Sequence, residues 1–170
     1  MATVAVLGPG SWGTALALLL ARNGHSVRLW GHDPEEIAPL RQERENRRYL
    51  PGIPFPPALR AGVDLAEALA GVELALVVVP SHAYGMTLAR LRPLLPKDAG
   101  FAWATKGLEP GGGRFLHEVT ADILGAAWPV AVISGPSFAR EVARGLPTAV
   151  TVASADAAHA GRVAALLHGS

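Results

Sequence analysis

The 170-residue sequence contains no cysteine. This absence excludes disulfide frameworks, thiolate metal sites and cysteine nucleophiles, and no metal site of another kind is indicated.

An excess of charge of one sign is also missing, because 15 lysine and arginine residues are balanced by 14 aspartate and glutamate residues, which gives a net charge of +1. A nearly neutral chain gives no electrostatic indication of nucleic acid or of an anionic membrane surface, so we expect neither as a partner.

Long apolar runs are missing as well. No stretch approaches the ~18 consecutive apolar residues that a membrane span needs. The opening residues, MATVAVLG, place no basic region in front of a long apolar core. We therefore expect a soluble protein that is not exported and that resides in the cytoplasm. Hydrophobic residues nevertheless make up 50% of the sequence, so one globular domain over residues 1–170 is the expected organisation.

Apolar, strand-like runs alternate with helix-favouring runs along the chain. This alternation predicts an α/β fold, a doubly wound and mostly parallel sheet of the Rossmann type with helices on both faces. The runs LALVVV and VAVI are continuously apolar, as is typical of strands covered on both faces. The predicted strands are 3–7, 26–30, 74–79, 100–104, 130–134 and 148–152, the predicted helices are 12–23, 34–47, 83–94, 114–124, 137–144 and 155–167, and the proline-rich segment 47–58 is predicted to be a loop.

The opening segment VAVLGPGSWGTALALLLARNG combines a strand, a tight turn and a helix. Its glycines fit the G-x-G-x-x-G pattern: we expect Gly8 to make the turn, Gly10 to admit a pyrophosphate close to the backbone, and Gly13 to let the helix pack on the strand. The start of the helix would add free N–H groups and a partial positive charge. The pattern favours a dinucleotide; a purely structural corner, S-adenosylmethionine or another nucleotide are the alternatives, and no G-K-[ST] follows to indicate a triphosphate loop.

The end of the second predicted strand reads RLWGHDPEE. An NAD-specific fold usually has an acidic residue here, about 20 residues after the glycines, to hold the ribose hydroxyls. Trp30 and Gly31 occupy the end of this strand, and Asp33 is equally well explained as the cap of a helix that begins at Pro34. His32 is the better candidate for contact with the adenosine ribose or its 2′-phosphate. The sequence leaves the choice between NAD and NADP open.

Three further predicted strands end at polar residues, where the ligands of doubly wound folds collect. After VVVP come Ser81, a candidate helix cap, and His82, a less favoured candidate for a catalytic acid. Lys106 follows another strand and is either a surface charge or a contact for an anionic or carbonyl oxygen. Gly135 and Ser137 lie between a strand and a helix, where they either cap the helix or face a ligand.

The segments GPGSWGTALA, NRRYLPG, VVVPSH, ATKGLE and ISGPSFAREVARGLPTAV together resemble, in order and spacing, the amino-terminal half of the bacterial NAD(P)-dependent glycerol-3-phosphate dehydrogenases. The resemblance implies NAD or NADP as the cofactor. It also implies interconversion of sn-glycerol 3-phosphate and dihydroxyacetone phosphate by hydride transfer, in glycerophospholipid synthesis. It implies cofactor contacts by Gly8, Gly10, Ser11, Trp12, Gly13, His32, Tyr49, Lys106 and Ala139, and substrate contacts by Lys106, Gly135 and Ser137.

Members of that family continue into a helical carboxyl-terminal domain, which supplies the lysine acting as general acid/base and the groups that bind the substrate phosphate. The resemblance thus implies that the general acid/base lies beyond Ser170. We therefore assign no catalytic residue within residues 1–170 and expect these residues alone to show negligible turnover. Relatives are often dimers, so the resemblance offers a homodimer as one candidate state of the full-length protein; the sequence leaves the oligomeric state open. Two alternatives stay open: a stand-alone NAD(P)-binding or sensing module, and a related dehydrogenase of another small 2-hydroxy or phosphorylated substrate.

Overall fold

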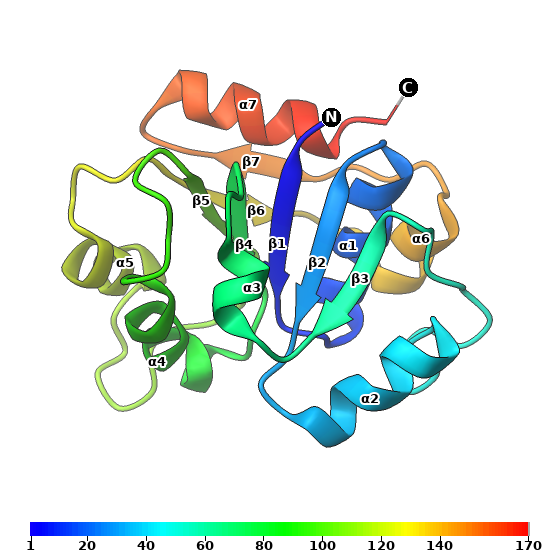
Figure 1. The fold of residues 1–170 in the computed structure, drawn as a ribbon. Coiled ribbons are helices and arrows are strands. Elements are labelled where there is room, and N and C mark those ends of the chain that lie inside the picture. The colour runs from blue at the N-terminus through cyan, green and yellow to red at the C-terminus, as the bar shows by residue number, and fades with distance from the viewer. Residues whose placement is uncertain (170) are drawn as a thin grey trace.

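A single sheet of seven strands runs through the computed structural model, which describes residues 1–169 (Figure 1). The strand order is β3-β2-β1-β4-β5-β6-β7, so the chain builds outward from β1 on one side and then crosses over to build outward on the other. The strands are β1 Thr3–Leu7, β2 Ser26–Trp30, β3 Leu59–Gly62, β4 Leu74–Val77, β5 Gly100–Trp103, β6 Val130–Ser134 and β7 Thr151–Ala153. The helices are α1 Ser11–Arg22, α2 Pro34–Glu43, α3 Leu65–Leu69, α4 Ser81–Leu91, α5 Leu116–Leu124, α6 Ala139–Arg144 and α7 Ala157–Leu167.

Ser170, beyond which the general acid/base is expected, lies outside the described residues. The structure therefore does not test where that group lies, and its position stays a prediction.

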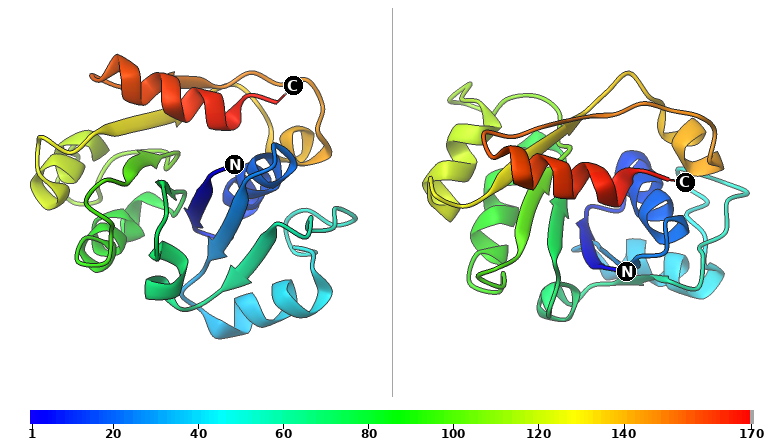
Figure 2. Two further views of the ribbon diagram at one scale, coloured as in Figure 1. Left: turned by 45° about the horizontal axis from the view of Figure 1, so that its top comes forward. Right: turned by 90° about the horizontal axis from the view of Figure 1, so that it is seen from above.

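Helices cover both faces of the sheet, and each face has its own hydrophobic core. Within β1, Val4 and Val6 belong to the core that also contains buried residues of α1, α2, α6 and α7. Ala5 and Leu7 point the other way, into the core formed with α3, α4 and α5. Because successive strand residues supply opposite cores, the whole strand must be apolar. The predicted doubly wound α/β fold is confirmed (Figures 1 and 2).

Two elements were not predicted from the sequence, β3 and α3. The strand β3 has only four residues and lies at one edge of the sheet, and Arg60 within it is exposed. The helix α3 has five residues and is capped by Asp64, whose side chain accepts a hydrogen bond from the backbone N–H of Glu67 (3.0 Å). Elements this short carry too few apolar residues for a clear periodic pattern.

Several predicted boundaries were wrong. The helix predicted over 34–47 ends at Glu43, because Arg44 adopts a left-handed conformation (φ 51°) and donates to the carbonyl oxygens of Pro56 (2.8 Å) and Leu59 (3.0 Å). The last strand, predicted over 148–152, begins at Thr151 and pairs antiparallel with β6. The other six strands are parallel to one another.

The predicted helix caps were confirmed in part. Asp33 caps α2, accepting from the backbone N–H of Glu35 (2.9 Å), and Gly24 has the expected left-handed conformation after α1 (φ +86°). Ser81 does not cap α4; it is the first residue of that helix, and Pro80 holds the cap position. Ser137 does not cap α6 either, because it precedes the cap residue, Phe138.

The segment 47–58 consists of turns and irregular backbone, which confirms the predicted loop, and its Pro54 forms an isolated bridge with Glu45. Its apolar side chains Leu50, Ile53 and Phe55 are buried in the core on the α1 face. The segment is therefore anchored to the sheet although it contains no regular structure. None of the helices within residues 1–169 is long and apolar enough to pass through a lipid bilayer.

Candidate nucleotide-binding site

A cavity of about 650 Å³ lies beyond the carboxyl ends of β1, β2, β4 and β5. It straddles β1, the point at which the order of the sheet reverses, and this is where doubly wound folds bind their ligands. Its volume falls within the usual range of ligand pockets. The residues that line it are Gly8, Pro9, Gly10, Ser11, Trp12, Gly13, Trp30, Gly31, His32, Glu36, Tyr49, Val78, Val79, Pro80, His82, Ala83, Met86, Thr87, Arg90, Ala104, Thr105 and Lys106.

The three glycines of the turn between β1 and α1 meet different surroundings. Gly8 has a positive φ of +122°, and a Cβ there would lie 2.6 Å from the carbonyl oxygen of Val78. A Cβ on Gly13 would overlap the carbonyl oxygen of Gly8. In contrast, no atom beyond Gly10 itself and its two chain neighbours lies within 4 Å of the place that a Cβ on Gly10 would take. The backbone therefore requires Gly8 and Gly13, whereas Gly10 borders open space in the cavity.

Two buried polar side chains, whose role no sequence motif indicates, hold this turn in place. The Thr14 hydroxyl donates to the carbonyl oxygen of Pro9 (3.1 Å). The side-chain amide of Asn46 donates to the same carbonyl (2.8 Å) and to the Thr14 hydroxyl oxygen (2.8 Å). Both residues are at most 1% exposed. A turn that is bonded from both sides keeps its shape without a ligand, which favours preorganised binding.

The start of α1 faces the cavity through its first-turn residues Ser11, Trp12 and Gly13. Gly10 is the residue before the helix, so no side chain caps the first N–H groups, and the first turn has no acidic residue. Unsatisfied N–H groups and the positive end of the helix dipole both favour an anion. This end of the cavity therefore suits a phosphate group.

Eight of the predicted contact residues come together in the cavity, from segments far apart in the sequence: Gly8, Gly10, Ser11, Trp12, Gly13, His32, Tyr49 and Lys106. Lys106 is exposed and follows Thr105, whose hydroxyl donates to the carbonyl oxygen of Val79 (2.8 Å). This bond connects the end of β5 to the segment after β4. His82, the less favoured candidate for a catalytic acid, also lines the cavity.

The corner after β6 lies outside the residues that line the cavity. Gly135 packs closely against the next segment, because a Cβ there would lie 2.9 Å from the carbonyl oxygen of Ala149. The Ser137 hydroxyl donates to the same carbonyl oxygen (2.6 Å), so it bonds to the chain itself. One interpretation of the sequence was that this hydroxyl faces a ligand above the sheet. Ala139 begins the short helix α6. Contacts of these residues with a ligand stay a prediction.

Arg90 and Trp30 line the cavity and were missed as site residues. The Arg90 guanidinium lies over the Trp30 ring, with Cζ 5.4 Å from the ring centre. A sequence signal did exist, because His82, Met86 and Arg90 recur every four residues and therefore share one face of α4.

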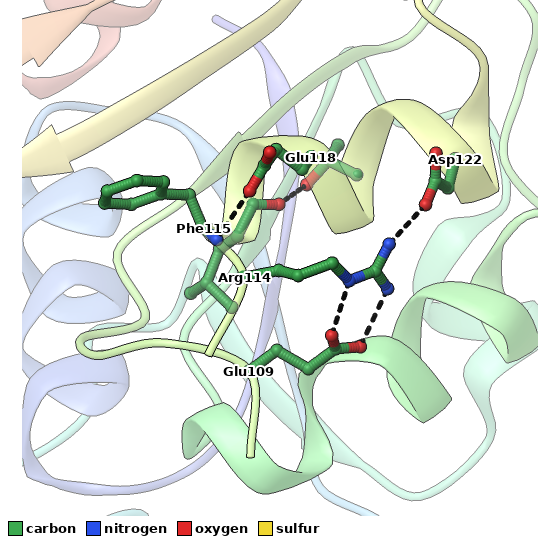
Figure 3. A network of polar contacts seen from close by, with 7 residues as sticks. Glu109, Arg114, Phe115, Glu118 and Asp122 are labelled. Atoms are coloured by element: carbon green, nitrogen blue, oxygen red, sulfur yellow. Dashed lines mark hydrogen bonds and ion pairs between the residues drawn. The ribbon is translucent and has the colours of Figure 1, made fainter. Parts of the chain in front are cut away.

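The loop that follows Lys106 is closed by a network of charges (Figure 3). Arg114 forms two hydrogen bonds with the carboxylate of Glu109 (2.7 and 3.0 Å) and one with Asp122 of α5 (2.6 Å). The hydrogen bond from Arg114 lowers the pKa of Glu109, and the hydrogen bonds to Glu109 and Asp122 raise the pKa of Arg114. The backbone N–H of Phe115 donates to Glu118 (2.8 Å), which fixes the start of α5.

A metal centre is not indicated by the geometry. Within residues 1–169, histidine, aspartate and glutamate side chains form no group of three that could hold a metal ion. The polar side chains of the cavity include the cations Lys106 and Arg90, the imidazoles of His32 and His82 and one carboxylate, Glu36, beside backbone N–H groups and hydroxyls. The cations, N–H groups and hydroxyls bind anionic oxygens.

Comparison with known proteins agrees with this geometry. A family model described as "NAD-dependent glycerol-3-phosphate dehydrogenase N-terminus" matches residues 3–160. The glycerol-3-phosphate dehydrogenases [NAD(P)+] of Xanthomonas campestris and Stenotrophomonas maltophilia are each 58% identical over 166 residues, which is 98% of this chain and 49% of theirs. The chain thus spans about half the length of these relatives.

Solved structures give the same result. The crystal structure of glycerol-3-phosphate dehydrogenase from Coxiella burnetii superposes with a TM-score of 0.94 at 48% identity, over 99% of this chain and 51% of that one. The enzyme of Saccharomyces cerevisiae superposes with a TM-score of 0.83 at 25% identity, over 98% and 54%. Because the family model covers nearly the whole sequence, the chain belongs to the family of the NAD-dependent glycerol-3-phosphate dehydrogenase N-terminus, as its five motifs predicted.

Proposed function

We propose that this chain is the dinucleotide-binding domain of a glycerol-3-phosphate dehydrogenase and that NAD or NADP binds in the cavity above the glycine turn. The observation that carries the proposal is the open space at Gly10, flanked by two glycines that the backbone itself requires. A side chain at Gly10 would fill the space in which a pyrophosphate can approach the backbone. The relatives that share this region are named for NAD(P)+.

The two ends of the cavity suit the two halves of a dinucleotide. In folds of this class the adenosine lies on the side of the second strand, so we assign His32, just beyond β2, to the adenosine ribose. Lys106, beyond β5, then lies on the nicotinamide side. When bound, the nicotinamide ring supplies the hydride chemistry. The Lys106 cation would attract the substrate oxygen on which negative charge develops.

For the whole protein we propose interconversion of sn-glycerol 3-phosphate and dihydroxyacetone phosphate, the reaction implied by the relatives' name. Gly135 and Ser137 follow β6, which neighbours β5 in the sheet, so substrate contacts there would lie beside Lys106. Ala139 would contact the cofactor from the same corner. Homodimerisation, a role in glycerophospholipid synthesis and residence in the cytoplasm stay predictions.

Titration with NADH, followed by cofactor fluorescence, tests the cofactor site. We expect saturable binding by the chain and an affinity at least about tenfold lower for Gly10→Val, since the valine would occupy the phosphate space. Gly161→Val is the matched control, because Gly161 lies in α7, away from the cavity, and also has no atom within 4 Å of its Cβ position. Equal NADH affinity of Gly10→Val and the unmodified chain would contradict the proposed site.

A further inference from the structure

The residue at the tip of the glycine turn offers the rest of the protein only one backbone group to hold. Pro9 lies between Gly8 and Gly10, and a proline has no N–H, so its carbonyl oxygen is the group that other residues can hydrogen bond. That carbonyl accepts from the side-chain amide of Asn46 (2.8 Å) and from the Thr14 hydroxyl (3.1 Å). Thr14 belongs to α1, so Asn46 supplies the contact to Pro9 that comes from outside the β1–α1 unit.

Asn46 also holds the segment that brings Tyr49 to the cavity. Its backbone carbonyl accepts the N–H groups of Tyr49 (3.2 Å) and Leu50 (2.8 Å). Leu50 is buried in the core on the α1 face, which anchors this short turn. Asn46 is therefore bonded through its side chain to the glycine turn and through its backbone to Tyr49. The glycine turn and Tyr49 both line the cavity, whereas Asn46 does not.

The side-chain amide of Asn46 makes these contacts at a cost to stability. The Pro9 carbonyl can only accept, and the Thr14 hydroxyl already donates its proton to that carbonyl, so the amide nitrogen must face both groups. The amide oxygen, Oδ1, is then buried with no hydrogen-bond partner among residues 1–169. An unpartnered buried oxygen destabilises a fold. A leucine of similar size would fill this space without that penalty, so folding alone does not require an asparagine here.

We propose that Asn46 is a positioning residue for the dinucleotide. It fixes the glycine turn relative to Tyr49, so that both contact one bound cofactor at the same time, and it does not touch the cofactor itself. This inference rests on the proposed function. Groups that contact a ligand bind it tightly only when the residues behind them hold their spacing, because a site that is loose before binding loses affinity when the ligand orders it.

Asn46→Leu tests this inference, because it removes the amide and leaves neither of its partners unpaired. In this variant the Thr14 hydroxyl still donates to the Pro9 carbonyl. We therefore expect the urea midpoint of unfolding to stay nearly unchanged. The affinity for NADH, measured by cofactor fluorescence, should fall at least about tenfold.

Thr14→Ser is the matched control, since it keeps the hydroxyl and both of its hydrogen bonds but removes a buried methyl group. It should lower the urea midpoint and leave the NADH affinity within about twofold of that of the unmodified chain. The two variants thus separate positioning from folding, because one changes affinity without stability and the other changes stability without affinity.

The outcomes also separate this inference from the proposed function. Unchanged NADH affinity of Asn46→Leu would overturn the positioning role and leave the dinucleotide site standing. A loss of affinity that follows the loss of stability in both variants would overturn it too, because the hydrogen bonds of Asn46 would then serve folding only.

If Asn46→Leu does not fold, Asn46→Ala takes its place, because it removes the amide without adding bulk. Its NADH affinity is measured under conditions in which it is fully folded, and an affinity equal to that of the unmodified chain would overturn the positioning role. Absence of saturable NADH binding by the unmodified chain would overturn the proposed function, and this inference with it.

Discussion

At the scale of single residues, glycines of one turn serve different purposes. Gly13 is needed because α1 passes directly over the carbonyl oxygen of Gly8, whereas Gly10 has open space beside it. Substitution at Gly13 should therefore affect folding, and substitution at Gly10 should affect binding. The G-x-G-x-x-G pattern alone does not separate these two effects.

We predict that Gly13→Ala lowers the free energy of unfolding by about 2 kcal/mol, because the added methyl group overpacks a backbone contact. Urea denaturation measures this change. Gly85→Ala in α4 is the control, since its Cβ would make an ordinary contact of 3.7 Å with Val119, and it should be neutral or stabilising by up to about 1 kcal/mol. An unchanged unfolding midpoint for Gly13→Ala would mean that α1 can shift away from the turn.

At the scale of elements, the loop between β5 and α5 depends on charge pairing. Residues 107–113 contain three glycines with positive φ, Gly107, Gly111 and Gly113, so the backbone there has little intrinsic preference for one shape. Arg114 closes the loop onto Glu109 and α5 (Figure 3). The same loop carries Lys106 at its start, so its order bears on the proposed site.

We predict that Arg114→Gln speeds amide hydrogen exchange in residues 107–113 and leaves the global unfolding midpoint nearly unchanged, because the pairs are exposed. Arg92→Gln, which removes an exposed positive charge outside this loop, is the control and should leave exchange in the loop unaltered. If exchange there is the same in Arg114→Gln as in the unmodified chain, the network does not order the loop.

The same network has a defined pH dependence. Because the hydrogen bond from Arg114 lowers the pKa of Glu109, the pair is fully formed above the ordinary pKa of a glutamate. Its contribution is lost as the pH falls through the lowered pKa of Glu109. The slower exchange of this loop in the unmodified chain, compared with Arg114→Gln at the same pH, should therefore disappear on acidification and persist when the pH is raised above neutrality.

At the scale of the whole molecule, the order of the strands creates the site. The chain builds outward on both sides of β1, and the loops after β1, β2, β4 and β5 therefore meet above one edge of the sheet. The chain covers about half of its relatives' length. In this half the structure provides the cavity in which we propose that a dinucleotide binds, and we assign to it no group that donates a proton to the substrate.

We predict that the 170-residue chain binds NADH but oxidises it with dihydroxyacetone phosphate at a negligible rate, because hydride transfer also needs a proton donor and a clamp for the substrate phosphate. The assay follows NADH absorbance, and the full-length Coxiella burnetii enzyme under the same conditions is the positive control. A rate comparable to that enzyme would show that this chain contains its own acid/base residue.

Much of the fold could be predicted because its physical causes are local. The strands β1, β2, β4, β5 and β6 were found because each is covered on both faces and is therefore largely apolar. The edge strand β3 was not predicted, because a short strand at the edge of a sheet has few buried residues. The antiparallel direction of β7 was not predicted either, because the residue pattern of a single strand does not encode the direction in which it pairs.

The sequence by itself determined the strand–turn–helix unit around Gly8, the order of the main elements and the family, because backbone preferences and burial act on neighbouring residues. Only the tertiary structure decided which distant side chains meet. It brings Arg90 onto Trp30 and Asn46 onto the Pro9 carbonyl, and it directs the Ser137 hydroxyl to Ala149. Such contacts depend on how helices and loops pack over the sheet, and that packing is settled by the core as a whole.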